Sequence, residues 1–309
     1  MTLIIPANTL SDSGYNISNS LRFEASGHKL TRTYGTPTSQ RIFTFSVWVK
    51  RSNFSGHNYL IGQNDTNEGY IRFTGPNGDE LNLEDRDSGT GSSDFSFQTS
   101  MLFRDPSSWY HIVIAFDTTQ STDTNRRKVY VNGVQQTSFS ASTIAPQNYD
   151  LQLNQSGPFQ IGSTFGDLGA YLSDYYFIDG QQKAASVFGE FNDNGVWIPK
   201  DPTDVKENVT FGDNGFLLEF KETGTSANSS GMGADTSGED NHWAATNLAA
   251  IDVTKDTPTN NFCTMSSIDT NTQASLSEGN TQLQQGSNYA GCNGTFGVAN
   301  GKWYWEVKT

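Results

Sequence analysis

Residues 109–133 constrain the possible folds of this chain most strongly. Large apolar side chains stand at every second position of their first half, at Tyr110, Ile112, Ile114 and Phe116. The positions between them hold His111, Val113 and Ala115, so the pattern predicts a β-strand that is buried on one face and nearly dry on the other. A strand covered on both faces is typical of the inside of a β-sandwich.

A long polar connection follows this strand. Residues 117–127 contain no core-forming pattern and are expected to form an exposed loop. Val129 and Val131 then alternate with more polar residues until Asn132-Gly133, a pair that is typical of the tight turns of β-hairpins. We therefore predict an antiparallel hairpin made of the strands on either side of the loop.

Other segments alternate in the same way. Residues 43–50 place four apolar side chains on one face, and we expect this strand at the centre of a sheet. Residues 168–178 are predicted to close the sandwich. The segments expected to form a meander are 59–62, 70–73 and 80–83. Further extended segments are predicted at 3–5, 20–23, 28–34, 94–103, 150–153 and 159–162.

Length and composition agree with a large all-β protein. The chain has 309 residues, of which 12% are aromatic and only 17% are charged. Aromatic and β-branched residues suit pleated sheets, whereas the abundant Asn, Asp and Gly suit turns. A chain of this length can form one large β-sandwich and a second unit.

The pattern changes after the predicted sandwich. Residues 184–191 form the best helix candidate in the chain. Residues 222–295 are mostly Ser, Thr, Asn, Gly and Gln with scattered apolar anchors, which favours a loop-rich connector laid over a neighbour. Residues 301–309 again have strand character, and a strand at the very end favours the interpretation that this is the front part of a longer protein. The expected domains are 1–190 (sandwich), 191–295 (loop-rich extension packed on it) and 296–309 (start of a further sandwich).

Charge and cysteine content limit the partners. The formal net charge of −14 repels phosphate backbones, so nucleic acid is not an expected partner. No apolar run approaches the roughly 20 residues that span a bilayer, and residues 1–15 lack the features of a secretory signal. Cys263 and Cys292 belong to no CxxC motif, so free or buried thiols are the favoured interpretation and a disulfide is the alternative.

Several segments resemble a known family. The first four are FTFSVWVKRS, RDPSSWYHIVIAFDTTQSTDTNRRKVYVNGVQ, FQIGS and LGAYLSDYYFIDGQ. They resemble the laminin-G-like and concanavalin A-like lectin domains of the pentraxin and laminin branch, and look most like the versions in virion proteins of tailed bacteriophages, especially marine ones. The later phrases FGEF, GVWIPK, NGFLLEF, ADTSGEDNHW and DTPTNNF are similar to the continuation of those proteins, so the resemblance covers most of residues 20–265. GKWYWEVKT resembles the opening strand of a SPRY domain.

The resemblance implies an all-β fold of the concanavalin A-like (laminin-G-like) type. This is an antiparallel β-sandwich jelly roll, here with a loop-rich C-terminal extension. The family also implies a rim of loops that can bind glycans or protein surfaces, and residence on a phage particle.

The resemblance further suggests calcium, because laminin-G-like and pentraxin domains often carry this ion on the rim. Calcium takes several oxygen ligands from Asp, Asn and carbonyl groups. The candidate ligands are Asn64, Asp65, Asn67 and Asp167. Because Asn and Asp also form ordinary turns, a turn without metal is the alternative.

Catalytic patterns are weak. Related jelly-roll glycanases place two carboxylates on one face of a strand, about 5 Å apart. The nearest equivalent here is the segment with Glu84, Asp85 and Asp87, in which Glu84 points away from the other two, so a solvated acidic loop is favoured. The four histidines show neither HxH nor HExxH spacing, which gives zinc chemistry no support. We predict no catalytic residues.

Aromatic side chains near predicted loops are candidate sugar-stacking platforms. The predicted ligand-binding residues are Tyr59, Tyr70, Phe165 and Tyr171. Trp48 and Trp109 lie within predicted strands and are expected in the core.

The sequence therefore favours a non-catalytic structural and adhesive protein of a phage virion. It would sit on the tail or capsid surface, be made in the host cytoplasm without a signal peptide, and contact host-surface glycan or protein through sandwich loops. Its other partners would be virion proteins and further copies of itself, in a homotrimer by analogy with phage fibres. Two alternatives remain, a capsid decoration protein without a ligand and a polysaccharide-degrading enzyme.

Overall fold

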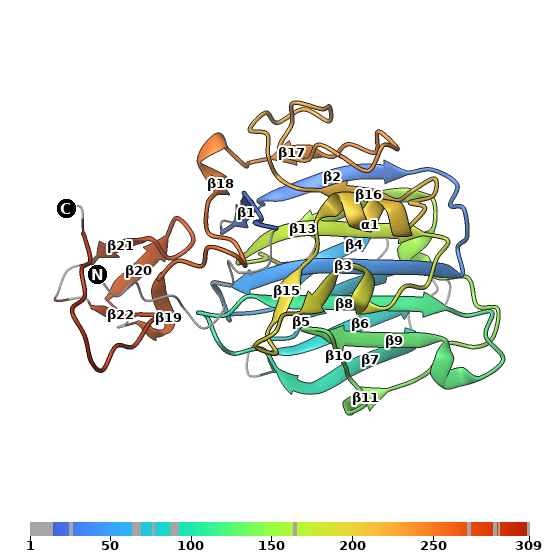
Figure 1. Ribbon diagram of the computed structural model, residues 1–309, viewed down its shortest axis with the longest axis horizontal. Helices are drawn as coiled ribbons and strands as arrows, with labels where there is room; N and C mark the ends of the chain where they lie inside the picture. The colour runs from blue at the N-terminus through green and yellow to red at the C-terminus, as the bar shows by residue number, and fades with distance from the viewer. Residues whose placement is uncertain are drawn as a thin grey trace.

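The computed structural model describes residues 15–24, 27–63, 69–75, 78–86, 93–162, 166–270, 273–286, 289 and 291–307 (Figure 1). Two large antiparallel sheets pack face to face and form a β-sandwich. The all-β antiparallel sandwich predicted from the sequence is thereby confirmed.

The first sheet contains the strands predicted most strongly. Its order is β10 (Val134–Gln135), β9 (Arg127–Val131), β8 (Tyr110–Asp117), β3 (Ile42–Arg51), β13 (Ala170–Asp179), β1 (Ser20–Phe23) and β18 (Val253–Thr254), with β16 (Phe216–Leu218) also paired to β13. The strand predicted over 43–50 is central, as expected, because β3 pairs with β8 on one side and with β13 on the other.

The second sheet contains the predicted meander. Its order is β11 (Phe139–Ser142), β7 (Ser93–Leu102), β6 (Glu80–Arg86), β5 (Gly69–Phe73), β4 (Asn58–Gln63), β12 (Gly157–Gly162), β2 (Lys29–Tyr34) and β17 (Ala244–Thr246). Strands β16, β17 and β18 come from the segment after residue 191, so this segment adds hydrogen-bonded strands to both sheets.

The predicted hairpin is confirmed. Strand β8 pairs with β9 from Ile112↔Val131 to Phe116↔Arg127, and the connection between them holds one 3₁₀ turn, η2 (Asp123–Asn125). Asn132 and Gly133 both have positive φ, as a two-residue turn of type I′ requires. Every residue of β8 is buried, which agrees with a strand covered on both faces.

The main core lies between the two sheets and is rich in aromatic side chains. Phe43 and Phe177 stack with ring centroids 5.3 Å apart, and Phe216 stacks on Phe177 at 5.8 Å. Tyr34 of the other sheet stacks on Phe159 at 4.1 Å. Burying each such side chain stabilises the fold by about 1.5–3 kcal/mol, so this core alone holds the two sheets together.

A second core covers the outer face of the first sheet. It joins Trp48, Val113 and Tyr176 of that sheet to side chains that follow β13 in the chain. The covering elements are the 3₁₀ turn η4 (Ala185–Val187), strands β14 (Gly189–Phe191) and β15 (Trp197–Pro199), and helix α1 (Pro202–Asn208). This second layer explains why the outward face of β8 is also buried.

The prediction of a helix over residues 184–191 is wrong. That stretch forms η4 and β14, because Gly189 pairs with Pro199 in a short hairpin. The α-helix of the described region is α1 instead, where the Asp201 carboxylate caps the N-terminus by accepting from the Thr203 N–H and Pro202 stands in the first turn. Proline at this position fits a helix start because its missing N–H would have no partner there.

The C-terminal part lies beside the sandwich at its left end in Figure 1. It contains two small sheets, β19 (Met265–Thr270) with β22 (Cys292–Gly294), and β20 (Ala274–Ser277) with β21 (Gln282–Gln285). The side chain of Arg22 and the hydroxyl of Tyr171 donate to the backbone carbonyls of Glu278 and Gly279, which ties the β20–β21 turn to the sandwich. The remaining 3₁₀ turns are η3 (Gln152–Asn154) and η5 (Ala250–Asp252).

The described part of the segment predicted as a C-terminal strand is not in a sheet. Residues 302–307 belong to no strand, and Tyr304 and Trp305 are 80% and 79% exposed. A strand needs a neighbour for its backbone hydrogen bonds, and within the described ranges no sheet pairs with these residues. Cys263 and Cys292 are both free, and neither is fully buried.

Candidate functional site

A pocket of about 230 Å³ opens where the second layer meets the first sheet. We call it the tryptophan pocket, and its lining residues are Trp48, Trp109, Asn132, Phe191, Gly195, Val196, Trp197, Pro199 and Pro258. Most of this lining is aromatic or apolar, with one side-chain amide. Such a composition is typical of small-ligand sites, in which apolar walls carry a few polar groups.

The local structure explains how the tryptophans meet. Trp48 points outward from β3, because Val47 and Val49 on either side of it belong to the main core. Trp197 lies on β15 opposite Phe191 of β14, with ring centroids 4.9 Å apart at 69°. The tight loop between these strands is held by the Asn192 side chain, which accepts two backbone N–H groups.

The β9–β10 turn, Asn132-Gly133, forms one wall of the pocket. A Cβ atom at Gly133 would lie 2.2 Å from the indole ring of Trp197, so only glycine fits there. The glycine also has positive φ, which side chains disfavour. Its neighbour Asn132 accepts from the His111 N–H at 2.7 Å through Oδ1.

Buried polar groups hold the rings in place. Trp197 donates through Nε1 to Nδ1 of His111 at 2.9 Å, and Nε2 of His111 lies 2.9 Å from the Ser46 hydroxyl. Because Nδ1 accepts, Nε2 carries the proton and donates to Ser46. Burial lowers the pKa of His111 to about 3, so the ring is neutral and stacks between Trp48 and Trp197 at centroid distances of 4.7 and 5.9 Å.

Few polar groups of the pocket remain free to bind a ligand. The indole N–H of Trp109 is also used, since it donates to Asp256 Oδ1 at 3.1 Å. Within the part of the chain that the structure describes, the amide Nδ2 of Asn132 has no hydrogen-bond partner. Trp48, Trp109 and Trp197 are only 5%, 3% and 7% exposed, so the pocket offers the margins of three indoles and one free amide donor, and the open ring face comes from Phe191, 52% exposed at its edge.

Two of the predicted sugar-stacking residues lie elsewhere, on the outer face of the second sheet. Tyr59 of β4 and Tyr70 of β5 have ring centroids 5.3 Å apart, and Arg72 lies over Tyr70 at 4.5 Å. The Arg72 guanidinium donates to the Tyr59 hydroxyl and to Asn82. The rings are only 4% and 2% exposed, so they differ from the expected platforms, which would need an open face.

The other two predicted aromatics are not part of the pocket either. Tyr171 points outward from β13 but is 2% exposed, because the C-terminal part covers it and its hydroxyl donates to the Gly279 carbonyl at 2.6 Å. It therefore presents no open ring face, in contrast to the prediction. Phe165 lies outside the described residues.

The predicted calcium ligands are only partly described. Asn64, Asp65 and Asn67 lie outside the described residues. Asp167 is described, and its backbone carbonyl accepts from the Asn58 side chain at 3.0 Å. Among the described residues, no three His, Cys, Asp or Glu side chains come together as metal ligands would.

The acidic segment on β6 does not form a catalytic pair in its described part. Glu84 points outward, where burial opposes its ionisation but hydrogen bonds from Tyr70 and Arg86 lower the pKa of its carboxyl. Asp85 points inward, is fully buried and accepts from the Tyr149 hydroxyl and the Gln152 N–H. Carboxylates on opposite faces of one sheet cannot act on the same bond. Asp87 lies outside the described residues.

A second cavity of about 330 Å³ lies between the sandwich and the C-terminal part. Its lining is polar and includes the side chains of Glu24, Asn53, Thr270 and Ser277. Burial raises the pKa of Glu24, although Arg22 opposes this. No aromatic side chain is among its described lining residues, so it offers hydrogen bonds but no stacking surface.

Sequence reasoning assigned Trp48 and Trp109 to the core and did not connect them with Trp197. One signal was available. Trp48 lies on the face of its strand opposite to the inward Phe43, Phe45, Val47 and Val49, so it had to meet some other part of the chain. The part that it meets includes residues more than 140 positions away, so the contact could not be predicted from the sequence near Trp48.

Comparisons with known proteins agree with this fold. Residues 24–180 match the family model described as the concanavalin A-like lectin/glucanases superfamily. No curated protein matches the chain.

Among solved structures, a candidate carbohydrate-binding protein from Bacteroides ovatus is similar at 15% identity and a TM-score of 0.50, over 78% of this chain and 60% of that one. The heptameric SAP-like pentraxin from Limulus polyphemus has 15% identity and a TM-score of 0.41, over 60% of this chain and 94% of that one. Domains LG4–5 of the mouse laminin α1 chain have 11% identity and a TM-score of 0.38, over 60% of this chain and 48% of that one. The chain spans about three fifths of the Bacteroides protein, and at these identities the likeness concerns the fold alone.

Proposed function

Because this chain belongs to the concanavalin A-like lectin/glucanases superfamily, we propose that it is a non-catalytic protein that binds carbohydrate in the tryptophan pocket. The observation that carries the proposal is the meeting of Trp48, Trp109, Trp197 and Phe191 around a small pocket with a free amide. A sugar ring has an apolar C–H face that stacks on aromatic rings and hydroxyl groups that need donors and acceptors.

The size of the pocket suits one sugar ring. Its 230 Å³ is below the roughly 300–1,000 Å³ of pockets that hold drug-sized ligands. A single ring stacked on Phe191 and touching the margins of the three tryptophans would be bound weakly and selectively. Several copies of the protein on one surface would then strengthen attachment through effective concentration.

We propose further that this attachment takes place on a phage virion, where the protein serves as a tail-associated or other surface adhesin for a host-surface glycan or protein. The support is the resemblance of residues 188–262 to the corresponding phrases of tailed-phage virion proteins. Other virion proteins and a homotrimer of this chain are the expected partners. Detection of its peptides in purified particles of the phage that encodes it, and the mass of the purified oligomer, test these two points.

The proposed sugar site is tested by titrating the full chain against a panel of immobilised host-surface polysaccharides. Phe191→Ala should weaken binding about tenfold, equivalent to about 1.4 kcal/mol, because it removes a stacking ring. Since Phe191 is half exposed, this change should leave the unfolding temperature nearly unchanged.

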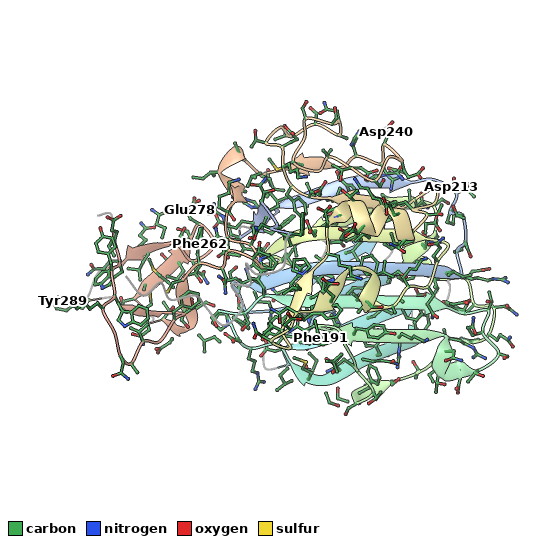
Figure 2. All side chains as sticks on the ribbon, viewed as in Figure 1. Phe191, Asp213, Asp240, Phe262, Glu278 and Tyr289 are labelled. Atoms are coloured by element: carbon green, nitrogen blue, oxygen red, sulfur yellow. The ribbon has the colours of Figure 1, made fainter. Side chains whose placement is uncertain are left out.

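A matched control is available in the C-terminal part of the molecule. Tyr289 is 95% exposed and lies far from Phe191 (Figure 2), so Tyr289→Ala should bind as the unaltered chain does. Equal weakening by both changes, or none by Phe191→Ala, would refute the pocket. Absence of binding to every polysaccharide would favour a decoration role, and shortened polysaccharide would favour an enzyme.

A further inference from the structure

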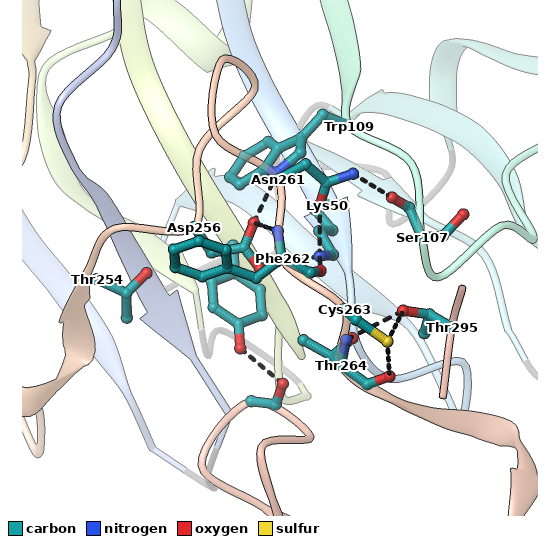
Figure 3. Close-up of polar contacts among 12 residues, drawn as sticks. Lys50, Ser107, Trp109, Thr254, Asp256, Asn261, Phe262, Cys263, Thr264 and Thr295 are labelled. Atoms are coloured by element: carbon teal, nitrogen blue, oxygen red, sulfur yellow. Dashed lines mark hydrogen bonds and ion pairs between the residues drawn. The ribbon is translucent and has the colours of Figure 1, made fainter. Parts of the chain in front are cut away.

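Lys50 is a buried cation outside the tryptophan pocket. It points outward from β3, but residues 256–262 cover it, and its side chain is only 1% exposed (Figure 3). Its Nζ atom donates to Asp256 Oδ2 at 2.9 Å, to Asn261 Oδ1 at 2.7 Å and to the Phe262 carbonyl at 2.7 Å. A primary amine, a side-chain amide and a carboxylate therefore meet at one point.

Further hydrogen bonds hold the three side chains, and all three are almost fully buried. Asp256 accepts through Oδ1 from the Trp109 indole and from the Phe262 N–H, at 3.1 and 3.3 Å. Asn261 donates through Nδ2 to the Ser107 carbonyl at 2.7 Å. Asp256 and Asn261 are only 3% and 5% exposed. Figure 3 shows the side chains of Trp109 and Phe262 enclosing the cluster.

This geometry favours reaction between the amine and the amide. Burial lowers the pKa of Lys50 even though Asp256 opposes the shift, which increases the fraction of neutral, nucleophilic amine. Because a C=O bond is about 1.2 Å long, the amide carbon of Asn261 lies within about 4 Å of Nζ. Fixed reactants at such a distance gain a large rate advantage over free ones.

We propose that Lys50 and Asn261 join in an intramolecular amide bond, with Asp256 as the catalytic acid and base. Transfer of one proton from the ammonium to Asp256 gives the neutral amine. Nζ then attacks Cγ of Asn261, Asp256 passes its proton to Nδ2, and the Cγ–Nδ2 bond breaks so that ammonia departs. The excess proton on Nζ moves to the freed Asp256 carboxylate, which ends the reaction protonated. An amine and a primary amide become a secondary amide and ammonia, so no oxidant or other co-reactant is needed.

The bond would fasten the extension to the sandwich. Lys50 and Asn261 are 211 residues apart in sequence, so the link would close a very long loop. A link of this kind restricts the unfolded chain and keeps β3 and residues 256–262 together even after the hydrogen bonds open. A protein that attaches a particle to a surface under load would benefit from it.

The test is the intact mass of the full chain, measured in denaturant. The mass should be lower than that of the sequence by one molecule of ammonia, after allowance for removal of Met1. A proteolytic digest should contain a branched peptide that joins the Lys50 and Asn261 segments. This peptide distinguishes the link from cyclisation of an asparagine, which also releases ammonia but creates no branch.

Substitutions in and beside the cluster test which residues form the bond. Lys50→Arg and Asp256→Ala should restore the full mass, whereas Lys255→Arg, an exposed neighbour, should retain the deficit. The measurement on the unaltered chain does not depend on whether the variants fold. A full sequence mass together with no branched peptide would overturn the proposal and leave the cluster as a buried ion pair.

Discussion

His111 shows how strongly the surroundings decide the chemistry of one residue. The ring lies between two indoles, its Nδ1 accepts from Trp197 and its Nε2 meets Ser46. It acts as a neutral spacer that fixes the pocket wall. A structural histidine is what the strand pattern favours at this position, but its partners could not be predicted, since the second layer that covers the strand comes from residues 185–217.

The state of His111 predicts a pH dependence of stability. Burial depresses its pKa to about 3, whereas an unfolded histidine titrates near pH 6.5. Between these values the unfolded chain binds the additional proton, so the free energy of unfolding falls as the pH is lowered from about 6.5 toward about 3. Relative to neutral pH, the loss at pH 4.5 should be about 2–3 kcal/mol.

Urea unfolding at the two pH values measures this effect, with His111→Gln as the comparison. Glutamine cannot titrate, so the variant should be less stable at neutral pH but should lose less on acidification. The carboxylates contribute equally to both proteins and cancel in the difference. Identical pH dependence in the two proteins would contradict a neutral buried histidine.

Among the elements, the strands were predictable and the helix was not. Alternation over β3, β8 and β13 is a local signal with a period of two, and it identified all three. Helix α1 has only seven residues, too few to establish a helical period. The local signal for it is the Asp201-Pro202 pair, a capping residue followed by proline.

The capping contact of α1 predicts a measurable contribution. Asp201→Ala removes the acceptor of the Thr203 N–H and should lower the free energy of unfolding by about 0.5–2 kcal/mol. Glu207→Ala, near the other end of the helix, should change stability by less, because it removes no cap. Urea unfolding of both variants at neutral pH checks the difference. A larger loss for Glu207→Ala would argue against the cap.

For the whole molecule, the packing of the extension creates the candidate site. Trp48 belongs to the first sheet and Trp109 directly precedes its strand β8, whereas Phe191, Trp197 and Pro258 come from later in the chain. The pocket exists only because these layers meet. No helix in the described ranges is long and apolar enough to cross a membrane.

The lining of the tryptophan pocket predicts that binding does not need metal. The pocket contains no carboxylate among its described lining residues, so a calcium chelator should leave polysaccharide affinity unchanged. Titration with and without chelator measures this, and an added excess of calcium serves as the control. Loss of binding with chelator would contradict this and would favour the predicted calcium ligands, Asp65 and Asp167 among them.

Alternation of apolar residues by itself determined the all-β sandwich, the central β3 strand and the β8–β9 hairpin, because strand periodicity is a local property of the chain. Tertiary structure alone decided which outward side chains are covered and by what. Trp48, Lys50 and Tyr171 all point away from the main core, yet one lines a pocket, one meets a carboxylate and an amide, and one is sealed by the C-terminal part. These outcomes depend on contacts between residues more than 100 positions apart, which no local pattern encodes.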